Sequence, residues 1–288
     1  MTQRPGDTRG TRWALAIGME TFLYTQTALF TLVLGRVGGI VTTAPLLSTP
    51  AAPIRVRAIL AVAMSMVVMP LFADTPLPGE LELIGFARMV VGEVLVGLLL
   101  GLGVTVLLSG VQLAGQMVSQ MAGMTLGEIS NPELDSSVSV YTQLFYFVTI
   151  AVFVTIGGHR MMIEALLQTF EWAPPGQAYL GESFPEAMVT MLSQSAELGV
   201  RASAPIVIAL FLSTVVLGLI SRTLPQINTI VVGFGVNSLL TLGVMMLTLG
   251  GVVWTFQEPL AGAIDFLAEA AAHRTPDDFR LAPLAPSP

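Results

Sequence analysis

Long, nearly unbroken runs of apolar residues alternate along this chain of 288 residues with short polar segments rich in proline, glycine and charge. A helix needs roughly 20 mainly apolar residues to cross a bilayer, so we expect each long run to form one membrane-crossing helix. The expected helices cover about residues 22–44, 58–72, 83–111, 141–156, 204–220 and 230–256. The pattern therefore predicts an all-α membrane protein with about six long apolar helices arranged in hairpins.

These helices are expected to form one membrane domain, residues 13–256, between two tails. Residues 1–12 are rich in Arg, Thr and Gly and are expected to be a disordered tail. Residues 273–288 are expected to be a second disordered tail because they are rich in proline. A short helix over residues 257–272 joins the domain to this second tail in our prediction.

Two shorter helices are predicted inside the domain. Residues 186–202 carry apolar residues on one side, which predicts an amphipathic helix that ends before the apolar run from Ala204. Gly157 and Gly158 are expected to end the run before them, and a short helix is predicted from there to Phe170.

The most polar stretch among the apolar runs extends from Gln112 to Pro132, near the middle of the chain. Its methionines, Met117, Met121 and Met124, have the spacing i, i+4 and i+7, so a helix would place all three on one face. Pro132 and the acidic residues around it are expected to stop such a helix. A flexible, Met-bearing segment of this kind is either a loop in water or the lining of a pore, although methionine most often fills irregular cores.

Composition narrows the functional classes. Only 11% of the residues are charged, against about 25% in soluble domains, which supports integration in a membrane. The chain has no Cys, two His and no Lys among its 12 basic residues, so disulfides, thiolate or Schiff-base chemistry and His-rich metal sites are excluded. Common hydrolase, metalloprotease and nucleotide-binding motifs do not occur in it. We predict a protein that is not an enzyme, uses no metal or other cofactor and, with a net charge of −7, does not act on nucleic acid.

The arginines suggest a topology. Short loops that carry Arg55, Arg57 and Arg222 are expected on the cytoplasmic side, where arginine is enriched. Simple alternation of the spans then places the acidic central stretch inside and the Arg-rich N-terminus outside, both against that rule. A re-entrant central segment would remove one of these two conflicts, since irregular backbone at membrane depth is tolerated where it lines a cavity.

Charged residues inside apolar runs are costly and usually functional. The five candidates are Arg36, Arg88, Glu93, Glu164 and Arg201. Glu197 and Arg201 are four residues apart and can pair on one helix face. A proton relay would need several carboxylates or histidines along a path, whereas Glu93 stands alone, so structural ion pairs or contacts to a partner subunit are the favoured interpretation.

Five groups of short motifs follow one another between about residues 30 and 245. They are Arg36-Val-Gly-Gly39 with Ala44-Pro45-Leu-Leu and Pro53-Ile-Arg55; Glu93-Val-Leu-Val-Gly97 with Gly101; Gly115-Gln-Met-Val-Ser-Gln-Met-Ala-Gly123 with Asn131-Pro132; Gly158-His159 with the segment from Phe170 to Pro174; and Arg222-Thr-Leu-Pro-Gln-Ile-Asn228 with Gly233-Phe234. In this order the motifs resemble the FliR/SctT family of type III protein export gates.

The resemblance implies a multi-pass protein of the bacterial cytoplasmic membrane, at the flagellar basal body or in an injectisome. One copy would assemble with several copies of FliP and FliQ around a channel for unfolded export substrates, with FlhB and FlhA beside it. The implied fold is a FliP-like part joined to a FliQ-like hairpin, which here would be residues 204–256.

The resemblance also implies roles for individual residues. The residues expected in a channel plug are Gly115, Gln116, Met117, Gln120, Met121, Gly123, Met124 and Gly127. Those expected to hold neighbouring helices or to contact partner subunits are Arg36, Pro45, Arg88, Glu93, Arg222, Pro225 and Gln226. Among the second group, Arg222 and Gln226 would lie at a cytoplasmic turn near FlhB.

Two other functions remain open at this point. A secondary transporter for a small solute would be expected to show an internal repeat and a polar site at the bilayer midplane. We find no repeat of fixed period in the chain, and polar residues within the apolar runs are sparse. A scaffold without a pore is the other alternative.

Overall fold

The computed structural model describes residues 8–48, 53–73, 75, 82–123, 139–178, 184–224, 226, 228, 231–248, 251 and 262. The elements in chain order are α1 (Thr8–Thr43), α2 (Ile54–Val68), the 3-10 helix η1 (Met69–Phe72), α3 (Leu83–Met121), α5 (Val140–Thr155), α6 (Gly158–Trp172) and α7 (Phe184–Thr223). A further helix covers Val231–Thr248. None of the described residues forms a strand, so the prediction of an all-α protein is confirmed.

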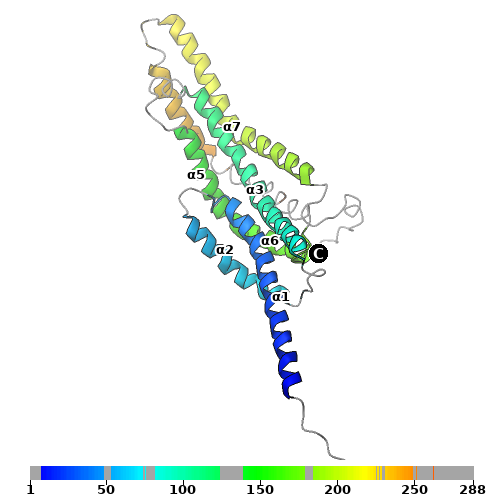
Figure 1. The fold of residues 1–288 in the computed structure, drawn as a ribbon. Helices are drawn as coiled ribbons and strands as arrows, with labels where there is room; N and C mark the ends of the chain where they lie inside the picture. The colour runs from blue at the N-terminus through cyan, green and yellow to red at the C-terminus, as the bar shows by residue number, and fades with distance from the viewer. Residues whose placement is uncertain are drawn as a thin grey trace, which may run out of the picture.

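Helix α3 is the element on which the others are assembled. It packs against α1, α5 and α7, and Figure 1 shows it running through the middle of an elongated bundle. Two glycines, Gly97 and Gly101, lie on its face toward α1, where a Cβ would collide with the backbone oxygen of Arg36 and the side chain of Thr43. The GxxxG spacing therefore has the role it often has in membranes, since small residues let two helix backbones approach closely.

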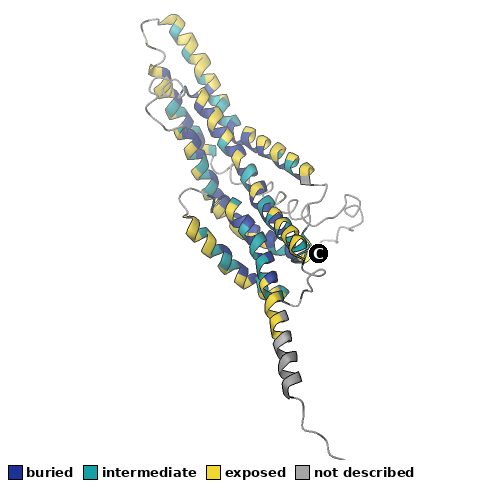
Figure 2. Ribbon diagram, in the orientation of Figure 1, coloured by how far each residue is buried: buried dark blue, intermediate teal, exposed yellow. Residues whose placement is uncertain are grey.

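The apolar core follows the contacts of α3. Leu107 and Val111 of α3 are fully buried, as are Val37 of α1, Phe153 of α5 and Leu210 of α7. Figure 2 shows buried positions concentrated where the helices meet α3, and exposed positions along α2 and the far end of α7. Exposed apolar faces of this kind mark surfaces that meet lipid or other subunits.

Four described helices are long and apolar enough to cross a membrane: Ile54–Phe72, Leu83–Met121, Pro185–Thr223 and Val231–Thr248. The number becomes five if α5 and α6, which meet at an angle of 61°, count as one broken span. The sequence had predicted about six spans. The run at residues 22–44, which was expected to be one of these spans, forms the later part of the longer helix α1, and α1 is not among the four helices named above.

The predicted break between α5 and α6 is confirmed. Gly157 has φ 78°, a left-handed conformation that favours glycine, and it directly precedes the first residue of α6. The predicted loop before the second span is present but shorter than expected: α1 ends at Thr43 and α2 begins directly after Pro53, so Arg55 and Arg57, which were expected in the loop, lie in the first turn of α2. Proline is well tolerated at such a position, where its missing N–H would have no helical partner.

The predicted break inside the α7 region is wrong. An amphipathic helix and a separate span were expected on either side of residue 203, but α7 continues through Pro205 from Phe184 to Thr223. Figure 1 shows α7 changing direction partway along its length. A proline normally removes one backbone hydrogen bond and bends a helix. Here Ala202 and Ile206, on either side of it, are buried, so packing maintains the helix through the bend.

Two further expectations concern the ends of the domain. Helix α1 begins at Thr8, so residues 8–12, which we expected in a disordered tail, are helical, and no proline interrupts them. The structure does not describe residues 1–7 or the expected tail at 273–288. Of the helix expected at residues 257–272, it describes only Gly262.

Candidate functional site

The last turns of α3 carry the residues predicted for the plug. The sequence prediction placed them in a flexible segment, with a re-entrant segment as one option, and noted that a helix would align the methionines. Helix α3 continues without a break to Met121, so the first part of the central stretch is helical. Gln and Met favour helices, and no proline occurs between Gln112 and Met121, so local propensity and packing agree there. A re-entrant segment before Gly123 therefore cannot explain why simple alternation of the spans places the acidic central stretch on the cytoplasmic side.

This end of α3 has one buried and one exposed face. Met117 and Met121 are 38% and 36% exposed, and Gln116 and Gln120 are exposed beside them. The prediction that the methionines share a helix face is confirmed for Met117 and Met121. Met124 and Gly127 lie outside the described residues. The exposed face is therefore a mixed surface of thioethers and amides.

The buried face is fixed against α5. A Cβ at Gly115 would lie 2.7 Å from the Cα of Thr142 and 3.2 Å from the Cβ of Phe145. Ser119 of α3 also donates a hydrogen bond to Ser139, the residue that precedes α5. Gly115 was expected to give the plug flexibility, but here it allows close packing of two helices. Sequence spacing could not distinguish these uses, because both need a residue without a Cβ.

Helix α3 ends at a left-handed glycine. Gly123 has φ 83°, and its N–H donates to the carbonyl oxygen of Gln120 at 3.2 Å. A left-handed residue after the last helical turn is a common way to end a helix, and glycine takes this conformation without steric cost. The described chain thus leaves α3 at Gly123 and returns at Ser139, where the serine pair joins the two ends.

A second cluster of predicted residues lies inside the bundle, between α1 and α3. The Nε of Arg36 is 2.6 Å from the Oε2 of Glu93, and the side chains of both residues are 0% exposed. The sequence named both residues as candidates for structural ion pairs but did not pair them with each other. A buried charge is tolerated only when it is paired and hydrogen-bonded, which makes their partners informative.

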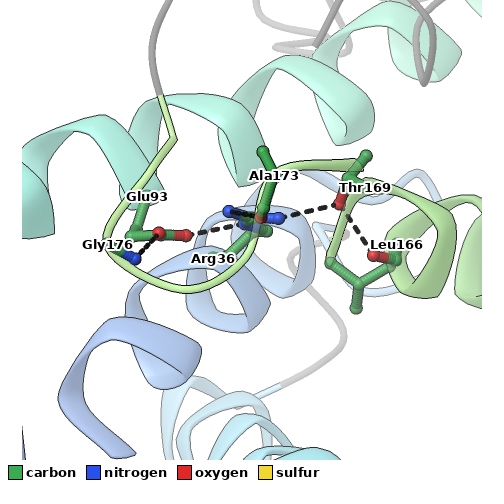
Figure 3. A network of polar contacts seen from close by, with 6 residues as sticks. All are labelled: Arg36, Glu93, Leu166, Thr169, Ala173 and Gly176. Carbon is green, nitrogen blue, oxygen red and sulfur yellow. Dashed lines mark hydrogen bonds and ion pairs between the residues drawn. The ribbon is translucent and has the colours of Figure 1, made fainter. Parts of the chain in front are cut away.

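The remaining partners of this ion pair come from α6 and the segment after it (Figure 3). The two terminal nitrogens of Arg36 donate to Thr169 Oγ1 at 3.3 Å and to the carbonyl oxygen of Ala173 at 2.9 Å. The backbone N–H of Gly176 donates to Glu93 Oε1 at 2.7 Å. The network therefore connects α1, α3, the end of α6 and the turn that follows it.

Packing around the network is equally close. The guanidinium carbon of Arg36 lies 4.1 Å from the centre of the Phe170 ring, within the range of a cation–π contact. Gly92, next to Glu93, has no room for a Cβ because the carbonyl oxygen of Ala178 would be 2.6 Å away. Sequence reasoning named neither Thr169 nor Gly176, and it included Ala173 only within the motif from Phe170 to Pro174, without a role. Backbone carbonyls and amides such as those of Ala173 and Gly176 have no side-chain signature.

The other predicted partner-contact residues are separate from this network. Arg88 is exposed, Pro45 is buried after the end of α1, and Arg222 and Gln226 are exposed at the turn that follows α7. Pro225 lies outside the described residues. The structure therefore joins Arg36 and Glu93 and places Pro45, Arg88, Arg222 and Gln226 apart from this pair.

The remaining intramembrane candidates form surface pairs. Arg201 pairs with Glu197, as predicted from their spacing, and Arg160 pairs with Glu164 at 2.8 Å. All four side chains are more than half exposed, so these pairs contribute little to stability. Among the residues that the structure describes, no group of three or more His, Asp or Glu side chains is arranged to hold a metal ion.

Comparison with known proteins identifies relatives of this chain. The chain is 26% identical to the flagellar biosynthetic protein FliR of Caulobacter vibrioides over 228 residues, which are 78% of this chain and 90% of that protein. It is 26% identical to FliR of Escherichia coli over 74% of this chain and 80% of that protein. It is also 26% identical to the secretion system apparatus protein SsaT of Salmonella typhimurium, over 56% of this chain and 62% of that protein.

The match to a family model is wider than the individual motifs. Residues 27–262 match the model of the bacterial export proteins, family 1. This range begins in α1 and includes the Arg36–Glu93 network, the end of α3 and the turn after α7. The chain therefore belongs to family 1 of the bacterial export proteins.

Proposed function

We propose that this chain is a FliR-type subunit of the flagellar type III export gate, in which it assembles with FliP and FliQ and contributes a plug to the protein-conducting channel. The coarser part of this function follows from the family: the chain is a non-enzymatic, multi-pass component of a type III export apparatus in the bacterial cytoplasmic membrane. FliR of Caulobacter vibrioides and FliR of Escherichia coli align with 78% and 74% of this chain, and SsaT with 56%, which supports a flagellar system and the flagellar basal body.

The observation that carries the plug proposal is the end of α3. A rigid helix, fixed to α5 by Gly115 and the Ser119–Ser139 hydrogen bond, presents Met117 and Met121 on an exposed face and stops at Gly123. Methionine is unbranched and adapts its shape to varied surfaces. Such a face suits a seal that blocks ions at rest and accommodates unfolded substrates during export.

Other surfaces fit the partner subunits of the proposed gate. The second half of α7 and the helix Val231–Thr248 lie side by side (Figure 1), and Ser213 donates to Asn237 Oδ1 across them at 2.7 Å. We assign this pair of helices as the FliQ-like hairpin, with its exposed apolar residues available to FliQ. The exposed Arg222 and Gln226 at its turn are assigned to the contact with FlhB, with FlhA further out.

Co-expression with FliP and FliQ tests this proposal. The complex would be extracted in mild detergent, purified on a tag placed on this chain and measured by native mass spectrometry. We expect one large complex that contains a single copy of this chain. Elution of the chain alone, with FliP and FliQ present in the extract but absent from the eluate, would reject the gate assignment and favour the transporter alternative.

A further inference from the structure

Two rows of side chains follow the exposed face of α3 over its last turns. The first row consists of three glutamines: Gln112, Gln116 and Gln120. The first of them is half-buried and the other two are exposed. The second row lies beside it and consists of Leu113, Met117 and Met121, which are 42%, 38% and 36% exposed. Residues four apart lie nearly above one another on a helix, so both rows follow the axis of α3.

The three glutamines, which we call the amide row, have side chains without a partner. No residue in the described part of the chain forms a hydrogen bond with their side-chain amides. An amide that faces hydrocarbon loses the hydrogen bonds that it makes in water, at a cost in free energy. The amide row therefore meets water or a polar partner rather than lipid.

The surroundings of the amide row in the sequence carry no charge. Between Glu93 and Glu128 the chain has no charged residue. A glutamine amide accepts hydrogen bonds through its oxygen and donates them through its nitrogen. The row therefore suits a ligand that presents both donors and acceptors, and it does not favour ligands of either charge.

An extended polypeptide presents such groups at nearly the spacing of this row. Each edge of an extended chain presents the N–H and C=O of every second residue, which lie about 6.7 Å apart. Glutamines four residues apart on a helix are separated by about 6 Å along its axis. Over the whole row the two repeats differ by about 1.5 Å, which flexible glutamine side chains can accommodate.

We propose that the amide row binds the main chain of the export substrate as it passes α3 in an extended form. Each glutamine exchanges hydrogen bonds with one N–H and one C=O of the substrate, and the neighbouring apolar row contacts the side chains of the substrate. The peptide group is common to all substrates, so this binding does not depend on their sequence. The inference rests on the proposed function and adds to it the chemical group of the substrate that is recognised.

Export assays in cells with the complete apparatus test the inference. Gln116→Leu with Gln120→Leu nearly keeps the size of the side chains and removes the amides. We expect export to fall about fivefold, the factor that loss of one ordinary hydrogen bond gives, with an unchanged yield of the complex. The factor should be the same for substrates that carry a Glu-rich or a Lys-rich tract. Gln143→Leu is the matched control, since Gln143 is an exposed glutamine on α5, and it should leave export unchanged.

Photocross-linking gives a direct readout of contact. A substrate stalled by a folded domain at its C-terminus would be illuminated in gates that carry p-benzoylphenylalanine in place of Gln120 or Gln143. We expect the substrate to be linked to the first position and not to the second.

Four results would overturn the inference while the gate assignment stands. They are unchanged export by the double variant, a loss confined to one of the two tracts, absence of a cross-link at position 120, and a reduced yield of the complex. The last result would make the amide row a contact with a partner subunit. Absence of FliP and FliQ from the purified unmodified chain is a different result, because it rejects the proposed function and this inference with it.

Discussion

At the residue scale, the Arg36–Glu93 pair shows how a charge can remain inside an apolar bundle. Each of the three guanidinium nitrogens donates a hydrogen bond: to Glu93, to Thr169 and to the carbonyl oxygen of Ala173. The cost of burying the ions is offset by these contacts, so the pair is a weak source of net stability but a strong constraint on structure. The turn after α6 depends on the pair, because Gly176 donates to Glu93.

Removal of either partner should be strongly destabilising. Arg36→Met or Glu93→Leu leaves one uncompensated buried charge, which typically costs about 3–5 kcal/mol. The double variant should recover part of the loss, because two apolar side chains can pack together, while the Gly176 N–H remains without its acceptor. Thermal unfolding in detergent measures the effect, with Arg160→Gln in the exposed pair as a control that should change little. A double variant no better than the singles would contradict this account.

Glycines on α3 give a second prediction at this scale. Gly97→Ala places a Cβ against the backbone oxygen of Arg36, which cannot move aside, and overpacking of this kind costs about 1–3 kcal/mol. Gly38→Ala is the matched control, because Gly38 lies in α1 and a Cβ there meets nothing within 4 Å. The control should stabilise the helix slightly, since alanine favours helix over glycine by roughly 0.5–1 kcal/mol. Equal melting temperatures for the two variants would refute close packing of α1 on α3.

At the element scale, contacts between helices explain where sequence reasoning succeeded and where it failed. The α5–α6 bend was predictable because Gly157 provides a local signal for a left-handed residue. The continuity of α7 through Pro205 was not, because its proline signals a break that tertiary packing overrides. The pairing of Arg36 with Glu93 spans 57 residues, and a single sequence holds no information on which buried charges meet.

The same contacts predict a cross-link between α3 and α5. The chain has no cysteine, so Ser119→Cys with Ser139→Cys introduces the only two thiols. Because the hydroxyl groups of these serines are hydrogen-bonded, the two side chains point toward each other, as the two halves of a disulfide must. We expect a disulfide to form on mild oxidation, detectable as a mass loss on denatured protein. Ser109→Cys with Ser139→Cys should not form one, because Ser109 is exposed and ten residues earlier on α3; absence of the first disulfide would show that α3 and α5 do not meet at this end.

At the scale of the whole molecule, the packed helices and the proposed sealing surface are two different parts of the bundle. The packed helices are α3 and, on it, α1, α5 and α7, and the Arg36–Glu93 network closes their interior. The proposed seal begins at the exposed face of α3 and continues beyond Gly123. Deleting residues 116–124 would remove the buried Val118 and Ser119 together with the exposed methionines. The deletion would therefore disturb helix packing as well as the proposed seal.

Point substitutions on the exposed face separate sealing from assembly. Met117→Ala with Met121→Ala removes two adaptable apolar side chains and leaves the buried face of α3 intact. In cells that carry the complete export apparatus, we expect raised ion permeability, measured as loss of membrane potential, with an unchanged yield of the complex. Met66→Ala is the control, since Met66 is an exposed methionine on another helix, α2. A double variant that assembles and remains as tight as the unmodified gate would exclude this face from the seal and leave the chain a role in assembly alone.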